Sequence, residues 1–241
     1  HQNHLDDYPP PVGYREQYTG RWTPPDLAAL GGSSARHLAG YYGMVKRLDE
    51  ALGRLLDALR SLSLLENTVV LFTSDHGCHF KTRNSEYKRS CHESSIRVPT
   101  ALCGRSFDGG GQIDALVSLI DLPPTLLDAV GLPIPPGMEG RSILPLLRGG
   151  SHEGVRTGRE GHPWPEEVFV QISESQVARA IRTRRWKYCV DAPDRNPWQH
   201  SGADRYVEEA LYDQQADPYE LDNLVGIEAY RAVADDLRRR L

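Results

Sequence analysis

The chain has 241 residues, of which 39% are hydrophobic and 25% are charged, and its formal net charge is −5. This balance is ordinary for a globular protein with one large domain, or with one domain and a small second unit. A nucleic-acid partner is disfavoured because the sequence carries no basic excess. No apolar run approaches the roughly 18 residues of a membrane-spanning helix, so we expect no transmembrane segment in this sequence.

The first sixty residues divide into an irregular part and a helical part. The sequence begins at His1 without a signal-peptide pattern, so we interpret the chain as processed or as a fragment, and its compartment stays open. Residues 1–33 are polar and rich in Pro and Gly, which predicts an irregular connection. Residues 35–61 carry apolar side chains at helical spacing, which predicts one long amphipathic helix.

Two short apolar runs and a further helix follow. Val69–Phe72 predicts a strand that is buried on both faces, and Pro99–Cys103 predicts a second strand. Another helix should begin at Asp121, which can act as its cap, carry Pro123 in its first turn and end at Gly131. Helices that alternate with buried strands indicate an α/β layered domain.

The composition changes at Gly149–Pro165, which predicts a linker between a domain over residues 1–150 and a second unit over residues 151–241. Short β-rich runs after this linker predict a small antiparallel sheet. Residues Ile227–Leu241 predict a closing helix.

Two further expectations concern the second unit and the cysteines. Trp186 and Tyr188 alternate along one run, as they would in a strand with one buried face. The four cysteines show no CxxC spacing, so buried free thiols are the default expectation and disulfides stay open. These cysteines are Cys78, Cys91, Cys103 and Cys189.

A candidate metal site lies where the first apolar run ends, in the stretch NTVVLFTSDHG over Asn67–Gly77. Ligands of open α/β sheets bind beyond the carboxyl ends of the strands, and Asp75 and His76 stand at such an end. Gly77 allows a sharp turn and a close approach of the backbone to a ligand. A carboxylate suits Ca²⁺ or Mg²⁺, whereas an imidazole suits Zn²⁺, Cu²⁺ or Fe. The alternative is a helix-capping Asp beside an ordinary loop His.

A cluster of charged residues follows in the stretch EYKRSCHESSIRVPT, which includes Lys88, Arg89, His92, Glu93 and Arg97. Cations beside a metal site suit an anionic substrate, because they neutralise charge that grows on oxygen in the transition state. The alternative is a solvated loop in which Glu93 and Arg97 pair at the surface and contribute little.

At these residues the chain resembles the sulfatases, within the alkaline-phosphatase-like superfamily. The similarity follows family order along almost the whole chain. It includes YYGMVKRLDEALGRLLDAL, LENTVVLFTSDHG, KRSCHESSIRVPT, LVSLIDLPPTLLDAVGLPIPPGMEGRSILPLL, AIRTRRWKY and LYDQQADPYELDNLV. The resemblance implies a three-layer α/β/α alkaline-phosphatase-like sandwich that is incomplete at its N-terminus. A small C-terminal antiparallel β subdomain should follow it.

The resemblance also implies roles for individual residues. Asp75 and His76 match the positions of metal ligands, most simply for Ca²⁺, with Mg²⁺ or Mn²⁺ as alternatives. Lys88 matches the lysine that touches the sulfate oxygens. His79 lies two residues beyond Gly77, and we assign it to the catalytic site as a side chain that faces the substrate, without a defined family role.

Two family features are absent from this sequence. Sulfatases carry a formylglycine that is made from Cys or Ser in a Cys/Ser-x-Pro-x-Arg motif, and no cysteine or serine here has that setting. The N-terminal Asp pair that completes the metal site is also missing, and both features lie upstream in the family. His1 or His4 falls near the substrate-contacting His of the family. We therefore expect a C-terminal part of a sulfatase that is poorly stable and inactive alone.

The function that the resemblance implies is sulfuric ester hydrolysis of the arylsulfatase type. It depends on a divalent metal, and the substrate is a small sulfate ester or a sulfated sugar. One alternative is a phosphonate monoester or phosphodiester hydrolase of the same superfamily. The other is a non-catalytic, sulfatase-like fragment, which the absence of the formylglycine motif upstream would favour.

Overall fold

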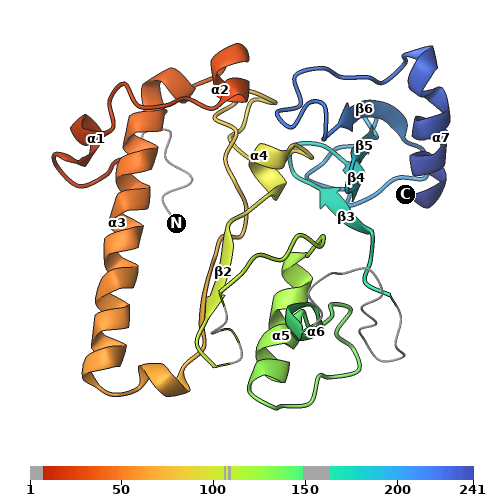
Figure 1. Cartoon of the computed structure of the whole chain (residues 1–241). Helices are drawn as coiled ribbons and strands as arrows, with labels where there is room; N and C mark the ends of the chain where they lie inside the picture. Colours follow the sequence, from red (N-terminus) through yellow and green to blue (C-terminus); the bar gives the residue numbers. More distant parts are fainter. Residues whose placement is uncertain (1–7, 106, 108–109, 149–162) are drawn as a thin grey trace.

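The structure, a computed structural model, describes residues 8–105, 107, 110–148 and 163–241. Figure 1 shows a long helix on one side, a strand region in the middle and a sheet with its own helix at the other end. The connection expected to be irregular over residues 1–33 contains two short helices where it is described. In chain order the elements are α1 (Tyr14–Gln17), α2 (Pro25–Ala29), α3 (Ser34–Ser61), η1 (Leu65–Asn67), β1 (Val70–Thr73), α4 (Glu93–Ile96), β2 (Thr100–Cys103), η2 (Leu119–Asp121), α5 (Leu122–Ala129), α6 (Leu144–Arg148), β3 (Glu167–Ile172), β4 (Ala178–Thr183), β5 (Trp186–Asp191), β6 (Val207–Asp213), η3 (Glu228–Tyr230) and α7 (Arg231–Arg240).

Helix α3 is the helix predicted over residues 35–61, and it begins one residue earlier. The preceding segment crosses its first half, where a Cβ on Gly40 would lie 2.5 Å from the carbonyl oxygen of Tyr8. Glycine is therefore required at this crossing. In the second half Leu48 and Leu55 are 56% and 63% exposed. Within the described residues, the apolar stripe of this helix is thus covered mainly near its N-terminus.

Strands β1 and β2 form an antiparallel pair, with Val70 opposite Cys103 and Thr73 opposite Thr100. Both strands begin one residue later than predicted, a shift that lies within the uncertainty of any strand boundary. The expected burial of the first strand on both faces is not observed in the described residues, where Phe72 is 37% exposed. The reason is that this sheet has two strands in the described part of the chain, so its faces and outer edges have few neighbours.

Helix α5 follows the 3-10 turn η2 directly. The carboxylate of Asp121 accepts hydrogen bonds from the backbone N–H groups of Ser118, at 2.9 Å, and Arg141, at 2.8 Å. Asp121 therefore occupies the N-cap position of α5, as the sequence predicted, but its side chain completes the capping box of η2 and makes no cap bond to α5. Gly131 follows the helix with a φ of 75°, the left-handed conformation predicted for its end.

The C-terminal part is a four-stranded antiparallel sheet in the order β3-β4-β5-β6, which confirms the predicted β-rich subdomain. Its closing helix is α7, preceded by the turn η3. The linker predicted over Gly149–Pro165 lies mostly outside the described residues. No helix within the described ranges has the length and apolar character needed to cross a bilayer.

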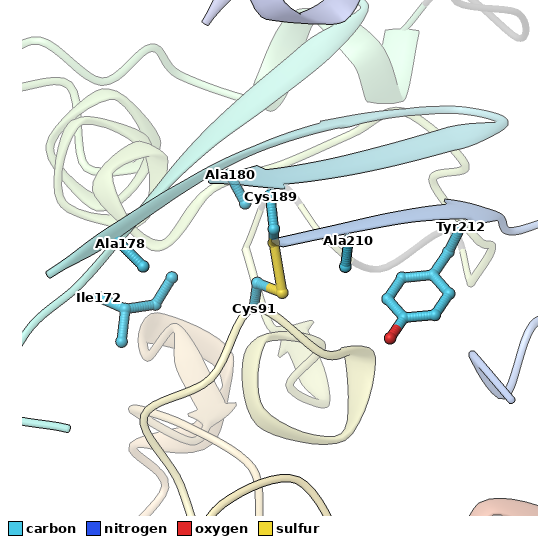
Figure 2. Packing of buried hydrophobic residues seen from close by; sticks show 7 residues of the cluster. All are labelled: Cys91, Ile172, Ala178, Ala180, Cys189, Ala210 and Tyr212. Carbon is cyan, nitrogen blue, oxygen red and sulfur yellow. A yellow bond between two sulfur atoms is a disulfide. The ribbon is translucent and has the colours of Figure 1, made fainter. Parts of the chain in front are cut away.

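Strand β5 is buried on both faces, so the expectation of one buried face is wrong. Tyr188 packs in a cluster with Leu237 of α7, which covers one side of the sheet. Cys189 points to the other side, where Figure 2 shows it joined to Cys91 below the strands. Lys187 lies on this second side as well and is fully buried. The sheet therefore lies between α7 and the segment that leads into α4, as Figure 1 also shows.

Candidate active site

The end of strand β1 holds the predicted metal pair. The backbone N–H of His76 donates to Oδ1 of Asp75 at 3.0 Å, and the hydroxyl of Ser74 donates to the carbonyl of His76 at 2.8 Å. These bonds turn the chain at the strand end and orient both side chains. The carboxylate of Asp75 is 78% exposed, so it is available to a ligand.

The ring of His76 has a defined tautomer because of its own backbone contact. Nδ1 lies 2.8 Å from the carbonyl oxygen of Gly77, and a carbonyl can only accept, so Nδ1 carries the hydrogen. Nε2 is left with a free lone pair, which is the form of imidazole that binds metals. Nε2 lies 3.6 Å from Oδ2 of Asp75, close enough for both atoms to contact one ion. The pair therefore fits a divalent cation.

Gly77 has a different role from the one expected. Its backbone N–H donates to the carbonyl of Ser95 at 2.7 Å. A Cβ at residue 77 would lie 2.1 Å from the carbonyl oxygen of Ser94, so any other residue would collide with the backbone. Glycine thus lets the strand end pack directly on helix α4, and this contact fixes the position of the metal pair relative to that helix.

Lys88 joins the metal pair from a second segment. Its Nζ lies 3.0 Å from Nε2 of His76, so the ammonium donates to the free lone pair of the imidazole. The same nitrogen lies 5.6 Å from the centre of the Tyr87 ring. The structure therefore brings the carboxylate of Asp75, the imidazole of His76 and the amine of Lys88 together in one partly exposed cluster.

His79 lies behind this cluster and is fully buried. Its Nε2 donates to the carbonyl of Lys88 at 3.1 Å, and its backbone N–H donates to the carbonyl of Tyr87 at 2.8 Å. Burial lowers the pKa of His79, although its backbone contacts oppose this shift, so the ring is neutral. The sequence led us to expect that His79 faces the substrate. Its described contacts are instead those of a residue that positions Lys88.

The segment between the metal pair and α4 is held against the C-terminal sheet. Cys91 and Cys189 form a disulfide across 98 residues, with their Cα atoms 6.8 Å apart. This pair corrects the expectation of free thiols, which holds only for Cys78 and Cys103. Nε2 of His92 lies 3.1 Å from the hydroxyl of Tyr212 in β6.

The alternative interpretation of the charged stretch, in which Glu93 pairs with Arg97 at the surface, is not what the structure shows. The Glu93 side chain is only 14% exposed and pairs with Lys187, at 2.7 Å, and with Arg182, at 3.1 Å. One feature of the sequence indicates this arrangement, because Lys187 interrupts the otherwise apolar run WKYCV. A lysine at such a position indicates a buried cation with a carboxylate partner.

Two other features lie apart from the cluster. A cavity of about 340 Å³ lies between α2, α3 and α4 and is lined by Trp22, Tyr41 and Arg97 among others. Asp75, His76 and Lys88 do not line it, so it is separate from the predicted site. The candidate substrate residues His1 and His4 lie outside the described residues.

The fold defines the class of this protein as an alkaline-phosphatase-like α/β protein. The structure of yidJ from Bacteroides fragilis, which is assigned to the sulfatases, matches with a TM-score of 0.76 at 23% identity. That match covers 96% of this chain and 49% of the other. The structure of BT4656, solved with its substrate D-glucosamine-2-N,6-O-disulfate, matches with a TM-score of 0.65 at 24% identity and covers 89% of this chain and 42% of the other.

The chain belongs to the sulfatase family. The family model described as Sulfatase matches residues 1–132, and the model described as N-sulphoglucosamine sulphohydrolase, C-terminal, matches residues 85–241. Arylsulfatase K of Mus musculus is 32% identical over 211 residues, which cover 88% of this chain and 35% of the relative. Arylsulfatase K of Homo sapiens is 32% identical over 218 residues, which cover 89% and 38%. The chain thus spans little more than a third of the length of these relatives.

Proposed function

We propose that this chain contributes part of the active site of an arylsulfatase-like sulfuric ester hydrolase that uses a divalent cation, preferably Ca²⁺. The observation that carries the proposal is the cluster at the end of β1, where Nζ of Lys88 lies 3.0 Å from Nε2 of His76 beside the exposed carboxylate of Asp75. Membership of the sulfatase family supports it. A carboxylate and an imidazole at one strand end suit the binding of a metal ion, and a lysine side chain beside them suits an anionic ester.

The residues of the cluster have separate roles in this proposal. Asp75, through its carboxylate, and His76, through Nε2, hold the cation, which when bound polarises the oxygens of the sulfate. Lys88 donates from its ammonium to a sulfate oxygen and stabilises the negative charge that develops there. His79 holds the backbone of Lys88 in place through the bond from its Nε2.

The remaining parts of the site are expected from sequence that precedes these residues in the family. Ca²⁺ takes about six to eight oxygen ligands, and Asp75 and His76 supply only two ligating groups. The formylglycine nucleophile also needs a Cys/Ser-x-Pro-x-Arg motif, which this sequence does not contain. We therefore propose that the 241 residues alone do not hydrolyse sulfate esters.

The substrate class follows from the anion that the cluster suits. We propose a small sulfate ester or a sulfated sugar, which agrees with the disulfated glucosamine bound by BT4656. The test is to express the complete gene, supply Ca²⁺ and assay an aryl sulfate and a sulfated monosaccharide. Turnover of either ester that falls when Lys88 is replaced by Ala supports the proposal. Turnover that is unaffected by this change contradicts it.

Hydrolysis of phosphonate monoesters or phosphodiesters is a second candidate function, and one comparison favours it. The phosphonate monoester hydrolase of Agrobacterium radiobacter matches with a TM-score of 0.65 at 26% identity and covers 84% of this chain and 40% of the other. The cluster of Asp75, His76 and Lys88 suits a tetrahedral phosphorus anion as well as a sulfate. A kcat/KM that is higher for an aryl phosphodiester or phosphonate monoester than for an aryl sulfate would favour this alternative.

The upstream sequence of the complete gene distinguishes a catalytic from a non-catalytic role before any assay is made. If the complete gene lacks a Cys/Ser-x-Pro-x-Arg motif upstream, the chain belongs to a sulfatase relative without the nucleophile, and a binding or structural role replaces catalysis.

A further inference from the structure

One residue of the C-terminal part contacts both ends of the segment that carries Lys88. Nη1 of Arg83 donates to the backbone carbonyl of Glu220 at 2.8 Å. The backbone N–H of Glu93 donates to Oε2 of Glu220, also at 2.8 Å. Lys88 lies between these two anchor points, so the segment 83–93 begins and ends on Glu220.

The backbone of Glu220 is in a conformation that residues with side chains rarely adopt. Its φ is 57°, in the left-handed region that glycine accepts most easily, and the residue is only 2% exposed. Such a conformation costs free energy and persists where the surroundings enforce it. Here Gln214 donates to Oε1 of Glu220 at 2.7 Å and Lys187 donates to the same oxygen. A turn at the protein surface would not need such hydrogen bonds from buried side chains to hold its conformation.

The charges around Glu220 are balanced within the interior. Lys187 is fully buried and pairs with Glu220 and Glu93, and Arg182 pairs with Glu93 as well. Two carboxylates therefore face two cations. Burial acts to raise the pKa of Glu93, but Lys187 and Arg182 outweigh it and hold the pKa below its ordinary value. Removing one charge leaves its buried partner uncompensated, which is costly.

We propose that Glu220 is a positioning residue for Lys88, which it serves by clamping both ends of the segment 83–93 to the C-terminal sheet. The inference rests on the proposed function, because it assigns Lys88 to the sulfate or phosphate ester. The clamp complements His79, which precedes the segment and donates to the carbonyl of Lys88. Glu220 itself touches none of Asp75, His76 and Lys88 among its described contacts.

The test uses Glu220→Gln in the protein expressed from the complete gene. Glutamine keeps the size and one acceptor oxygen, so the change mainly removes the charge that Lys187 faces. The matched control is Glu228→Gln, at an exposed residue of η3. Hydrogen–deuterium exchange of peptides that cover residues 83–93 should increase in Glu220→Gln and stay unchanged in the control. The kcat on an aryl sulfate should fall by about tenfold to hundredfold, as small misplacements of a catalytic group do.

A double mutant distinguishes a loss of kcat that comes from misplaced Lys88 from a loss that comes from general destabilisation of the protein. In a Lys88→Ala background, Glu220→Gln should cause no further loss of kcat, because the group that it positions is already gone. Equal losses in both backgrounds would overturn the proposal, and so would unchanged exchange of residues 83–93. If Glu220→Gln does not fold, Arg83→Lys tests the other anchor, since lysine lacks the planar fork whose two terminal nitrogens donate separately to the carbonyls of Glu220 and Tyr219.

Failure of the proposed function would look different from failure of this inference. A protein that turns over no sulfate, phosphate or phosphonate ester contradicts the proposed function. In that protein, faster exchange of residues 83–93 in Glu220→Gln, but not in Glu228→Gln, would still support the clamp. Equal exchange in the two variants would overturn it.

Discussion

Nζ of Lys88 donates to Nε2 of His76 across 3.0 Å, although twelve positions of sequence separate the two residues. The lone pair that accepts this bond is also the one that we assign to the metal. The ammonium of Lys88 and the metal cation therefore compete for the same atom of His76. Because of this competition, removing Lys88 should not weaken Ca²⁺ binding, whereas removing the charge of Asp75 should weaken it.

Replacement of Lys88 by Met should lower kcat but not cation affinity. We expect kcat on an aryl sulfate to fall by about 10²-fold to 10³-fold, because a donor to the developing charge is lost. Ca²⁺ affinity, measured by calorimetric titration, should stay equal or increase, because a competing positive charge is removed. Arg54→Met, at an exposed residue of α3, is the control. Weaker Ca²⁺ binding in Lys88→Met would contradict the assignment of His76 Nε2 to the metal.

Replacement of Asp75 by Asn should lower both kcat on an aryl sulfate and the affinity for Ca²⁺. The amide keeps the shape of the carboxylate but loses the charge that attracts a divalent cation. Since Asp75 is largely exposed, the melting temperature without added cation should stay close to that of the wild type. Asp49→Asn, at another exposed residue of α3, serves as the comparison. Wild-type Ca²⁺ content and rate in Asp75→Asn would show that the metal binds elsewhere.

Removal of the disulfide between Cys91 and Cys189 should destabilise the protein. Bridges that close long loops typically contribute about 2–4 kcal/mol, so the double Ala variant should lose about that much unfolding free energy in denaturant titrations. Cys103→Ser, at an exposed free thiol, should change it by less than about 0.5 kcal/mol. Alkylation of the unfolded, non-reduced protein should modify only two of these four cysteines, and modification of all four would refute the bridge.

Stability should fall as the pH falls below the ordinary pKa of histidine. Burial, with Arg83 and Lys187 nearby, lowers the pKa of His92 to about 2, so the folded state keeps His92 neutral while the unfolded state takes up a proton. The stabilising effect is therefore fully present above about pH 6.5 and decreases as the pH falls, by about 1.4 kcal/mol per pH unit.

The check on this prediction is a pair of variants measured between pH 7 and pH 5. His92→Gln should lose about 2 kcal/mol less unfolding free energy over this range than the wild type. His200→Gln, at an exposed histidine, should follow the wild-type curve. The buried His79 contributes to the slope that remains, because its pKa is also lowered. Parallel curves for His92→Gln and the wild type would show that His92 titrates normally.

The elements that the sequence predicted well are those with a long or local signal. Helix α3 repeats its apolar pattern over more than seven turns, so its bounds were right to within one residue. The strand-end rule and the family resemblance placed Asp75, His76 and Lys88 at one site because each lies in a recognisable stretch. The burial of His79 was not predictable, since two residues beyond a turn the direction of a side chain depends on packing that the sequence does not display.

The contacts with the C-terminal sheet were not predictable in the same way. Glu93 and Glu220 are 127 positions apart, and Cys91 and Cys189 are 98 apart, with no spacing pattern to pair them. Strand β5 was expected to have one buried face because its alternation shows only that one side is apolar. Its other side is covered by the segment before α4, and that covering depends on tertiary structure alone.

The clamp on Glu220 also has a consequence for the order in which the protein matures. The site residues Asp75, His76 and Lys88 are synthesised well before Glu220, and domains of growing chains fold broadly from the N-terminus. The segment 83–93 therefore lacks its anchor until the ribosome has translated the turn beyond β6. A gene interrupted after that segment would encode every recognisable motif of the site described here and still leave Lys88 unplaced.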